Sequence, residues 1–164
     1  MEMVPYGYSE EEQIQAQSIV VEYFEARKKE GGTIGSTPED YFSLIRTAPS
    51  GENGKNYFSY LVRLIDKKGK EIPVAFFAGE KILENTVGMY STITQRFPVH
   101  FKNEKWDMTG FTAIPQYIHL EIFRKLKESG VKMVHLGGSE TEGLDIQKTQ
   151  MGGEPQKTHW VVAD

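Results

Sequence analysis

The chain has 164 residues, a length that suits one domain with one sizeable core. Its net charge of −4 argues against a general nucleic-acid binder, which needs a basic excess. The absence of cysteine excludes disulfides, thiolate nucleophiles and cysteine-ligated metal sites. No apolar run approaches the roughly 20 residues that span a bilayer, and residues 1–5 lack the pattern of a signal peptide. We therefore expect a cytoplasmic protein with a single domain over residues 1–164.

Two helices are predicted in the first third of the chain. Ser9 and Glu12 have the spacing of a capping box, and the helix that they begin ends at Gly31-Gly32. Thr37 caps the second helix, with Pro38 at its first position. This second helix ends before Pro49.

Three antiparallel strands are predicted next, over residues 57–65, 73–78 and 86–94. Turns over 66–69 and 80–83 separate them. Alternation in the third strand places the following side chains on one side: Val87, Met89, Ser91 and Ile93.

The last third predicts a helix over 113–129, a short buried strand over 131–136, a helix over 140–151 and a final strand over 159–162. Strands that alternate with helices imply parallel pairing, whereas the earlier hairpins imply antiparallel pairing. The expected fold class is therefore α/β or α+β, with helices that flank a mixed central sheet.

The turn Gly137-Gly138-Ser139, between a strand and a helix that starts at Glu140, is the strongest candidate for a ligand site. Glycines let a ligand approach the backbone, and the N–H groups of a helix start attract a phosphate, a carboxylate or an oxyanion. Lys148, about two turns further on, adds a positive charge. In the alternative interpretation the glycines only make the turn, with Ser139 as the helix cap and Glu142 as its capping-box partner.

Four other residues are candidates for the site. Asp107 precedes Thr109-Gly110 and is a candidate general base, and His135 stands at a strand end, where catalytic groups gather in α/β folds. Tyr90 is a candidate general acid, and Arg96 a candidate for binding a phosphate or a carboxylate. The four histidines lack metal-binding spacing, so no metal site is expected.

Several blocks of the sequence together resemble the GNAT-like acyltransferase domain of the Fem-type (FemABX-like) aminoacyltransferase superfamily. The blocks are Pro-Glu-Asp-Tyr-Phe-Ser-Leu at 38–44, Gly-Lys-Glu-Ile-Pro-Val-Ala at 69–75, Lys-Glu-Ser-Gly-Val-Lys at 127–132, and Leu-Gly-Gly-Ser-Glu-Thr-Glu-Gly-Leu at 136–144, with Lys148 four residues on. The last block is the most specific, and the resemblance covers residues 9–148.

This resemblance implies a GNAT-like fold and the transfer of an aminoacyl or acyl group to an amine or hydroxyl of a small-molecule or peptide acceptor. The donor would be an aminoacyl-tRNA or an acyl-CoA, and a tRNA would then be a partner. The lysine at the position of Lys148 would steady a charged intermediate or a phosphate. Residues 95–98 and 110–115 lack the Gln/Arg-x-x-Gly-x-Gly/Ala signature with which GNAT enzymes hold CoA. Two alternatives therefore stay open: a non-catalytic binding module, and one half of a two-domain Fem-type enzyme.

Overall fold

The computed structural model describes residues 2–31, 35–47, 56–65, 69–95, 102–103, 106–107, 114–137 and 142–155. In chain order the elements are β1 (Glu2–Pro5), α1 (Glu10–Lys29), α2 (Pro38–Thr47), β2 (Tyr57–Ile65), β3 (Glu71–Leu83), β4 (Thr86–Thr94), β5 (Lys102–Asn103), β6 (Trp106–Asp107), α3 (Ile114–Glu128), β7 (Met133–His135) and α4 (Glu142–Gln150). The strand predicted over 159–162 lies outside the described residues.

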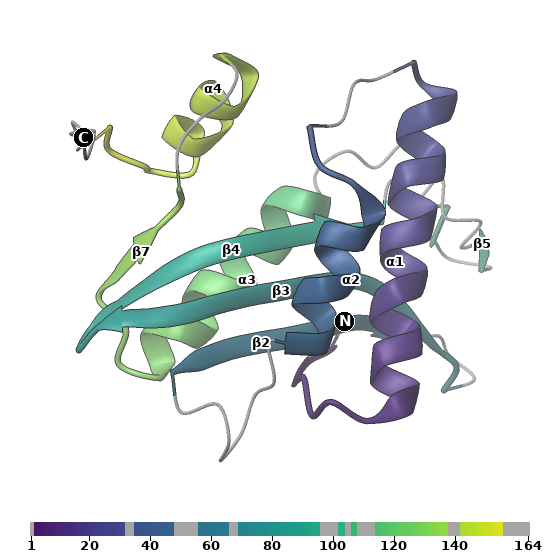
Figure 1. Ribbon diagram of the computed structural model, residues 1–164, viewed down its shortest axis with the longest axis horizontal. Helices are drawn as coiled ribbons and strands as arrows, with labels where there is room; N and C mark the ends of the chain where they lie inside the picture. Colours follow the sequence, from purple (N-terminus) through teal and green to yellow (C-terminus); the bar gives the residue numbers. More distant parts are fainter. Residues whose placement is uncertain are drawn as a thin grey trace, which may run out of the picture.

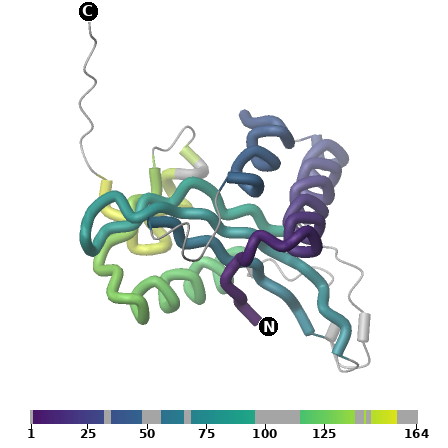
Figure 2. The backbone as a smooth tube through the Cα atoms, turned by 60° about the horizontal axis from the view of Figure 1, so that its bottom comes forward, coloured from purple at the N-terminus to yellow at the C-terminus, as the bar shows by residue number. Residues whose placement is uncertain are grey.

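A mixed sheet forms the centre of the described structure, with the strand order β1-β2-β3-β4-β7. Its first three pairings are antiparallel, and β4 pairs with β7 in parallel. Helices α1 and α2 lie on one face of this sheet and α3 on the other, while α4 follows β7 beyond the end of the sheet (Figures 1 and 2). The predicted class, a mixed central sheet flanked by helices, is confirmed.

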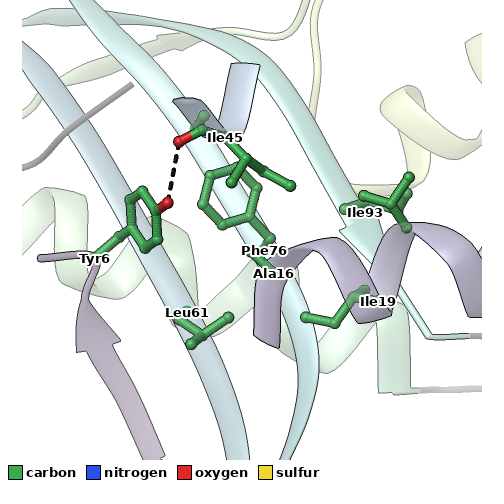
Figure 3. Close-up of a cluster of buried hydrophobic side chains, with 9 residues drawn as sticks. Tyr6, Ala16, Ile19, Ile45, Leu61, Phe76 and Ile93 are labelled. Carbon is green, nitrogen blue, oxygen red and sulfur yellow. Dashed lines mark hydrogen bonds between the residues drawn. The ribbon is translucent and has the colours of Figure 1, made fainter. Parts of the chain in front are cut away.

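The core between the sheet and α1 and α2 explains why the apolar residues of these elements are spaced as they are. Its buried side chains come from β2, β3, β4, both helices and the segment after β1: Tyr6, Ala16, Ile19, Val20, Ile45, Leu61, Phe76, Ala78 and Ile93 (Figure 3). The Tyr6 hydroxyl donates a hydrogen bond of 3.0 Å to the carbonyl of Ile45, which joins the N-terminal segment to α2. A second core, around Phe77 and Ile122, lies between the sheet and α3.

The predicted starts of the first two helices are confirmed, whereas those predicted for the last two helices lie outside the described residues. Ser9 Oγ accepts a hydrogen bond from the Glu12 amide at 3.2 Å, and Glu12 Oε2 accepts one from the Ser9 amide at 3.0 Å. At the start of α2, Thr37 and Asp40 exchange equivalent bonds of 2.7 and 3.4 Å. Both pairs satisfy N–H groups that have no partner inside the helix.

Several expectations about the strands are wrong. Residues 80–83 continue β3, because this segment pairs with both β2 and β4, and the turn falls at Glu84-Asn85. The strand over 131–136 is shorter and not buried, since Met133 and His135 are exposed. The short N-terminal strand β1, which pairs with β2, was not predicted.

The four side chains assigned to one side of β4 lie on two opposite faces. Val87 and Met89 contribute to the core under α3, whereas Ile93 belongs to the core under α1 and α2. An extra residue in the middle of β4, Tyr90, reverses the alternation.

No helix in the described ranges is long and apolar enough to cross a membrane. Within the same ranges, no group of three or more histidine, aspartate or glutamate residues is arranged to hold a metal ion.

The buried His119 on α3 makes stability depend on pH. Its side chain is 7% exposed, and Nδ1 lies 2.7 Å from the carbonyl of Pro115. Burial lowers the pKa of His119 below its usual 6.5, although the hydrogen bond to Pro115 opposes this shift. The unfolded chain therefore binds the proton first, so we expect stability to fall as pH drops through about 6.5.

Urea unfolding at pH 8 and pH 5.5 tests this expectation. The wild type should lose more stability between the two values than His119→Gln, which cannot titrate. Glu12 also has a lowered pKa, because its hydrogen bonds from Ser9 and Gly7 outweigh the effect of burial, but its contribution is lost only below its usual 4.5. If the wild type and His119→Gln lose equal amounts of stability between pH 8 and pH 5.5, the proposed role of His119 is contradicted.

Candidate active site

The strands β4 and β7 run together for only three residue pairs. The last pair is Gly88 with His135, where β7 ends. Residues 89–94 of β4 continue, and within the described residues no strand pairs with them on that side. Figure 1 shows β7 turning away from the line of β4 towards α4. Among the described residues, the backbone N–H and C=O groups along this part of β4 thus have no strand partner on that side, which is the arrangement that an extended ligand requires.

A β-bulge lies where the two strands separate. Gly79 of β3 pairs with Met89, and the preceding Ala78 pairs with Ser91, so Tyr90 is an extra residue on β4. A bulge interrupts the ladder, increases the local twist and changes the direction in which backbone groups point, and it is common next to active sites. Here it adjoins the last residues that β4 and β7 share.

One row of paired residues crosses the sheet at this point. Tyr57 of β2 pairs with Glu80 of β3, Glu80 pairs with Gly88 of β4, and Gly88 pairs with His135 of β7. Side chains of paired residues point to the same face, and Tyr57 packs against the core under α1 and α2. The row therefore lies on the face that carries α1 and α2. The glycine leaves a space between a carboxylate and an imidazole.

Tyr90 lies beside this row. Its hydroxyl donates a hydrogen bond to Glu80 Oε2, and its side chain is 54% exposed. The hydrogen bond to the Glu80 carboxylate, followed by burial and the charge of Glu80, raises the pKa of Tyr90 to about 12. The phenol therefore stays protonated at neutral pH, as a proton donor must.

His135 and Lys148 both contact the turn at Gly137. The Gly137 amide donates a 3.2 Å hydrogen bond to His135 Nδ1, so the neutral imidazole of His135 carries its proton on Nε2. Lys148 Nζ donates to the Gly137 carbonyl at 3.2 Å, which ties α4 to the end of β7. Gly137 has a φ of +70°, a conformation that favours glycine. Thus the structure brings three of the residues predicted for the site together at one turn.

A surface hollow of about 560 Å³ lies on the opposite side of the sheet, between the end of α3 and β7. Its lining includes Phe123, Leu126, Val131 and Val134. Among the described residues its lining has no carboxylate, histidine or tyrosine, and its ionisable side chains are those of Lys127 and Lys132. The row with its bulge is the better candidate for a reaction centre.

No protein-family model and no curated protein sequence matches the chain. Solved structures do match its fold. Ribosomal-protein-alanine N-acetyltransferase from Brucella melitensis biovar Abortus 2308 is similar over 100% of both chains, with a TM-score of 0.57 and 9% identity. A protein from Desulfovibrio desulfuricans assigned to the GNAT family of acetyltransferases has a TM-score of 0.60 and 8% identity, over 95% of this chain and 87% of its own. AAC(6')-Iy, bound to the bisubstrate analogue CoA-S-monomethyl-acetylneamine, has a TM-score of 0.56 and 6% identity, over 100% and 99%.

The chain has a GNAT-like fold. Of the remaining predicted site residues, only Asp107 lies in the part of the chain that the structure describes. Asp107 lies on β6, which pairs with β5 at the far end of the main sheet from β7 (Figure 1). Arg96, Gly138, Ser139 and Glu140 lie outside the described residues.

Three residues of the row, Tyr57, Glu80 and Gly88, were not predicted. Glu80 falls in a segment that the sequence predicts to be a turn, and Tyr57 is the first residue of its strand. The pairing of Glu80 with Gly88, beside the extra residue Tyr90, becomes informative only when the register is known.

Proposed function

We propose that this chain transfers an acyl group from a coenzyme A thioester to an amine by direct attack. The observation that carries this proposal is the separation of β4 from β7 after Gly88 and His135, with a bulge at Tyr90 on the edge that is left open. The GNAT-like fold and the acetyltransferases that share it support the same reaction class.

The open edge of β4 suits the donor. The pantetheine arm of CoA is an extended chain with two amide groups, and an extended chain with amides can bind to a strand edge as an added strand. The thioester would then lie at the bulge. There, backbone N–H groups released from the ladder can stabilise the oxyanion that forms when the thioester carbonyl is attacked.

The reaction needs a neutral amine and a proton donor for the leaving group. The amine nitrogen bonds to the carbonyl carbon, the C–S bond breaks, and the proton that the nitrogen loses replaces, through water, the proton that the donor gives to the leaving thiolate. Tyr90, protonated at neutral pH, is the proposed donor of a proton to the departing thiolate. His135, whose Nε2–H is directed away from its bond with Gly137, is proposed to hold a carbonyl oxygen.

The remaining predicted residues keep narrower proposed roles. Lys148 is proposed to fix the turn at Gly137 through its hydrogen bond and to add positive charge near an anionic part of the donor. Gly138, Ser139, Glu140 and Arg96 are proposed as ligand-binding residues from their sequence positions, and Asp107 as a general base. An aminoacyl-tRNA donor remains a prediction from the Fem-type resemblance.

The proposal is tested by measuring the melting temperature with acetyl-CoA, longer acyl-CoAs and free CoA, and the release of CoA in the presence of simple amines. Binding to the folded state raises the melting temperature by mass action. We expect a shift with at least one acyl-CoA, and CoA release that depends on the amine. A chain that neither binds nor consumes any acyl-CoA would contradict the proposal.

Two glycine substitutions separate the effect on the donor from the effect on stability. Gly137 and Gly130 both have positive φ, +70° and +89°, and an added Cβ meets no atom within 4 Å at either position. Alanine should therefore cost a similar amount of stability at each, about 1–2 kcal/mol. Because only Gly137 contacts both His135 and Lys148, only Gly137→Ala should also lower kcat/KM for the acyl-CoA, by about tenfold or more. Equal losses of activity in Gly130→Ala would show that stability alone is responsible.

A further inference from the structure

The carboxylate of Glu80 is the charged centre of a small cluster, of which the proposed acyl transfer uses only Tyr90. Tyr57 is its paired neighbour on β2, and the hydroxyl of Tyr90 is hydrogen-bonded to it from β4. The two tyrosines are close enough for Tyr57 to affect the pKa of Tyr90 electrostatically. Glu80 and Tyr57 are half-buried and Tyr90 is more than half exposed, so the cluster can be reached from solvent.

No lysine, arginine or histidine in the described ranges forms an ion pair with Glu80. Two other carboxylates, Glu71 of β3 and Glu12 of α1, do have such a partner, because both lie within 4.0 Å of Arg63. A carboxylate beside two aromatic rings is chemically suited to an ammonium group, which gains a charge-assisted hydrogen bond and a cation–π interaction there.

The position of the cluster relates it to the acceptor. Glu80 lies on β3, one strand away from β4, and the opening for the donor lies on the far side of β4. Since neighbouring strands are about 4.8 Å apart, the backbone at Glu80 lies about 7 Å, measured across the sheet, from the middle of that opening. Gly88, between them, has no side chain of its own, and the neighbouring side chain is that of Ile82, which is 49% exposed and whose Cγ2 would lie 3.4 Å from a Cβ added at Gly88.

We propose that Tyr57, Glu80 and Tyr90 bind a positively charged amino group of the acceptor, and that the acceptor is a molecule with two amino groups about 7 Å apart. One amino group is held as an ammonium ion at Glu80. The other, uncharged, reaches the thioester at the bulge. An acceptor of this class has roughly four or five methylene groups between its nitrogens. The inference rests on the proposed acyl transfer for the second amine, but the ammonium site itself does not depend on it. Glu80 is thus a specificity-determining residue.

The test uses 1,4-diaminobutane and, as the matched monoamine, butylamine. Binding of each to the wild-type chain and to Glu80→Gln is measured by calorimetry in low salt, without any CoA compound. We expect the diamine to bind the wild type more tightly than the monoamine. Its Kd should rise about tenfold or more in Glu80→Gln, the size expected for loss of a hydrogen bond to a charged group.

Three controls make the outcome clear. Glu84→Gln removes an exposed carboxylate from the nearby turn and should leave diamine binding unchanged. Tyr90→Phe keeps the ring but loses the hydroxyl, and it should weaken binding less than Glu80→Gln. Higher salt should weaken diamine binding in the wild type, because salt screens the attraction between the charges. A melting curve for each variant confirms that it is folded.

The binding and turnover measurements separate the two proposals. If wild type binds the diamine no better than butylamine, or if Glu80→Gln binds it equally well, the ammonium site is wrong even where acyl-CoA is consumed. If the diamine binds through Glu80 but no acyl-CoA is bound or consumed, the site stands and the proposed acyl transfer fails. With both correct, Glu80→Gln lowers kcat/KM for the diamine more than kcat/KM for butylamine, because both reactions lose the hydrogen bond to Tyr90 but only the diamine also loses its ammonium site.

Discussion

Replacing Phe76 with alanine is expected to lower the free energy of unfolding by about 3–5 kcal/mol. Phe76 is 1% exposed at the middle of β3, where its ring meets that of Tyr6 edge-on at 5.2 Å between centroids. Figure 3 shows it between the sheet and the helix carrying Ala16 and Ile19. The substitution removes an aromatic ring from a core supplied by both helices and the sheet, and the surrounding elements can close the resulting cavity only in part.

Chemical denaturation measures this loss, as a lower midpoint with an unchanged slope. Leu83→Ala is the matched control, because Leu83 ends the same strand and is 66% exposed. It should change the free energy of unfolding by no more than about 0.5 kcal/mol. If Phe76→Ala lowers the free energy of unfolding as little as this control, the core between the sheet and α1 and α2 is not what stabilises the fold.

The helices and their starts could be predicted because the signals lie within a few residues of one another. Ser9 and Glu12 are three residues apart, as are Thr37 and Asp40, and each pair makes its hydrogen bonds inside one turn. Such bonds form wherever the segment becomes helical, whatever it packs against. The order of strands and helices likewise predicted both the mixed sheet and the parallel pairing of β7.

The bulge could not be predicted, because it is a property of two paired strands and not of one. Val87, Met89, Ser91 and Ile93 alternate without interruption in the sequence. Only the pairing with β3 shows that Tyr90 is an extra residue, after which the strand's side chains change face. A period-2 pattern predicts which face each side chain lies on only when the strand is regular and has no bulge.

The residues of the candidate site likewise fall into those that could be predicted from the sequence and those that could not. His135, Gly137 and Lys148 lie within 14 positions in the sequence, and a strand–turn–helix motif was enough to select them. Tyr57, Glu80 and His135 come from three strands, and the register of the sheet places them in one row. Local sequence contains no signal for that row, so its carboxylate was missed.

Gly79 supports the bulge, and we expect Gly79→Ala to damage both stability and function. An added Cβ would lie 2.9 Å from the carbonyl oxygen of Gly88 and 3.0 Å from Val87 Cγ1. The first contact is with backbone, so β4 itself must move. Forcing atoms into a packed region of this kind costs about 1–3 kcal/mol. Because Gly79 pairs with Met89 beside the extra residue Tyr90, the shift falls on the bulge that is proposed to hold the thioester.

Gly88→Ala is the matched control for Gly79→Ala. At Gly88 the nearest atom to an added Cβ is Ile82 Cγ2 at 3.4 Å, on a side chain that is 49% exposed and free to turn aside. Gly88→Ala should therefore change the free energy of unfolding by no more than about 0.5 kcal/mol. Denaturation curves for the two variants, with acetyl-CoA binding measured on each at a temperature where both are folded, decide the matter. Similar losses of stability in both would mean that the close approach of β3 to β4 at Gly79 does not constrain the bulge. If only Gly79→Ala loses stability, and it also binds acetyl-CoA more weakly, then the close approach of β3 to β4 at Gly79 maintains the geometry of the proposed donor site.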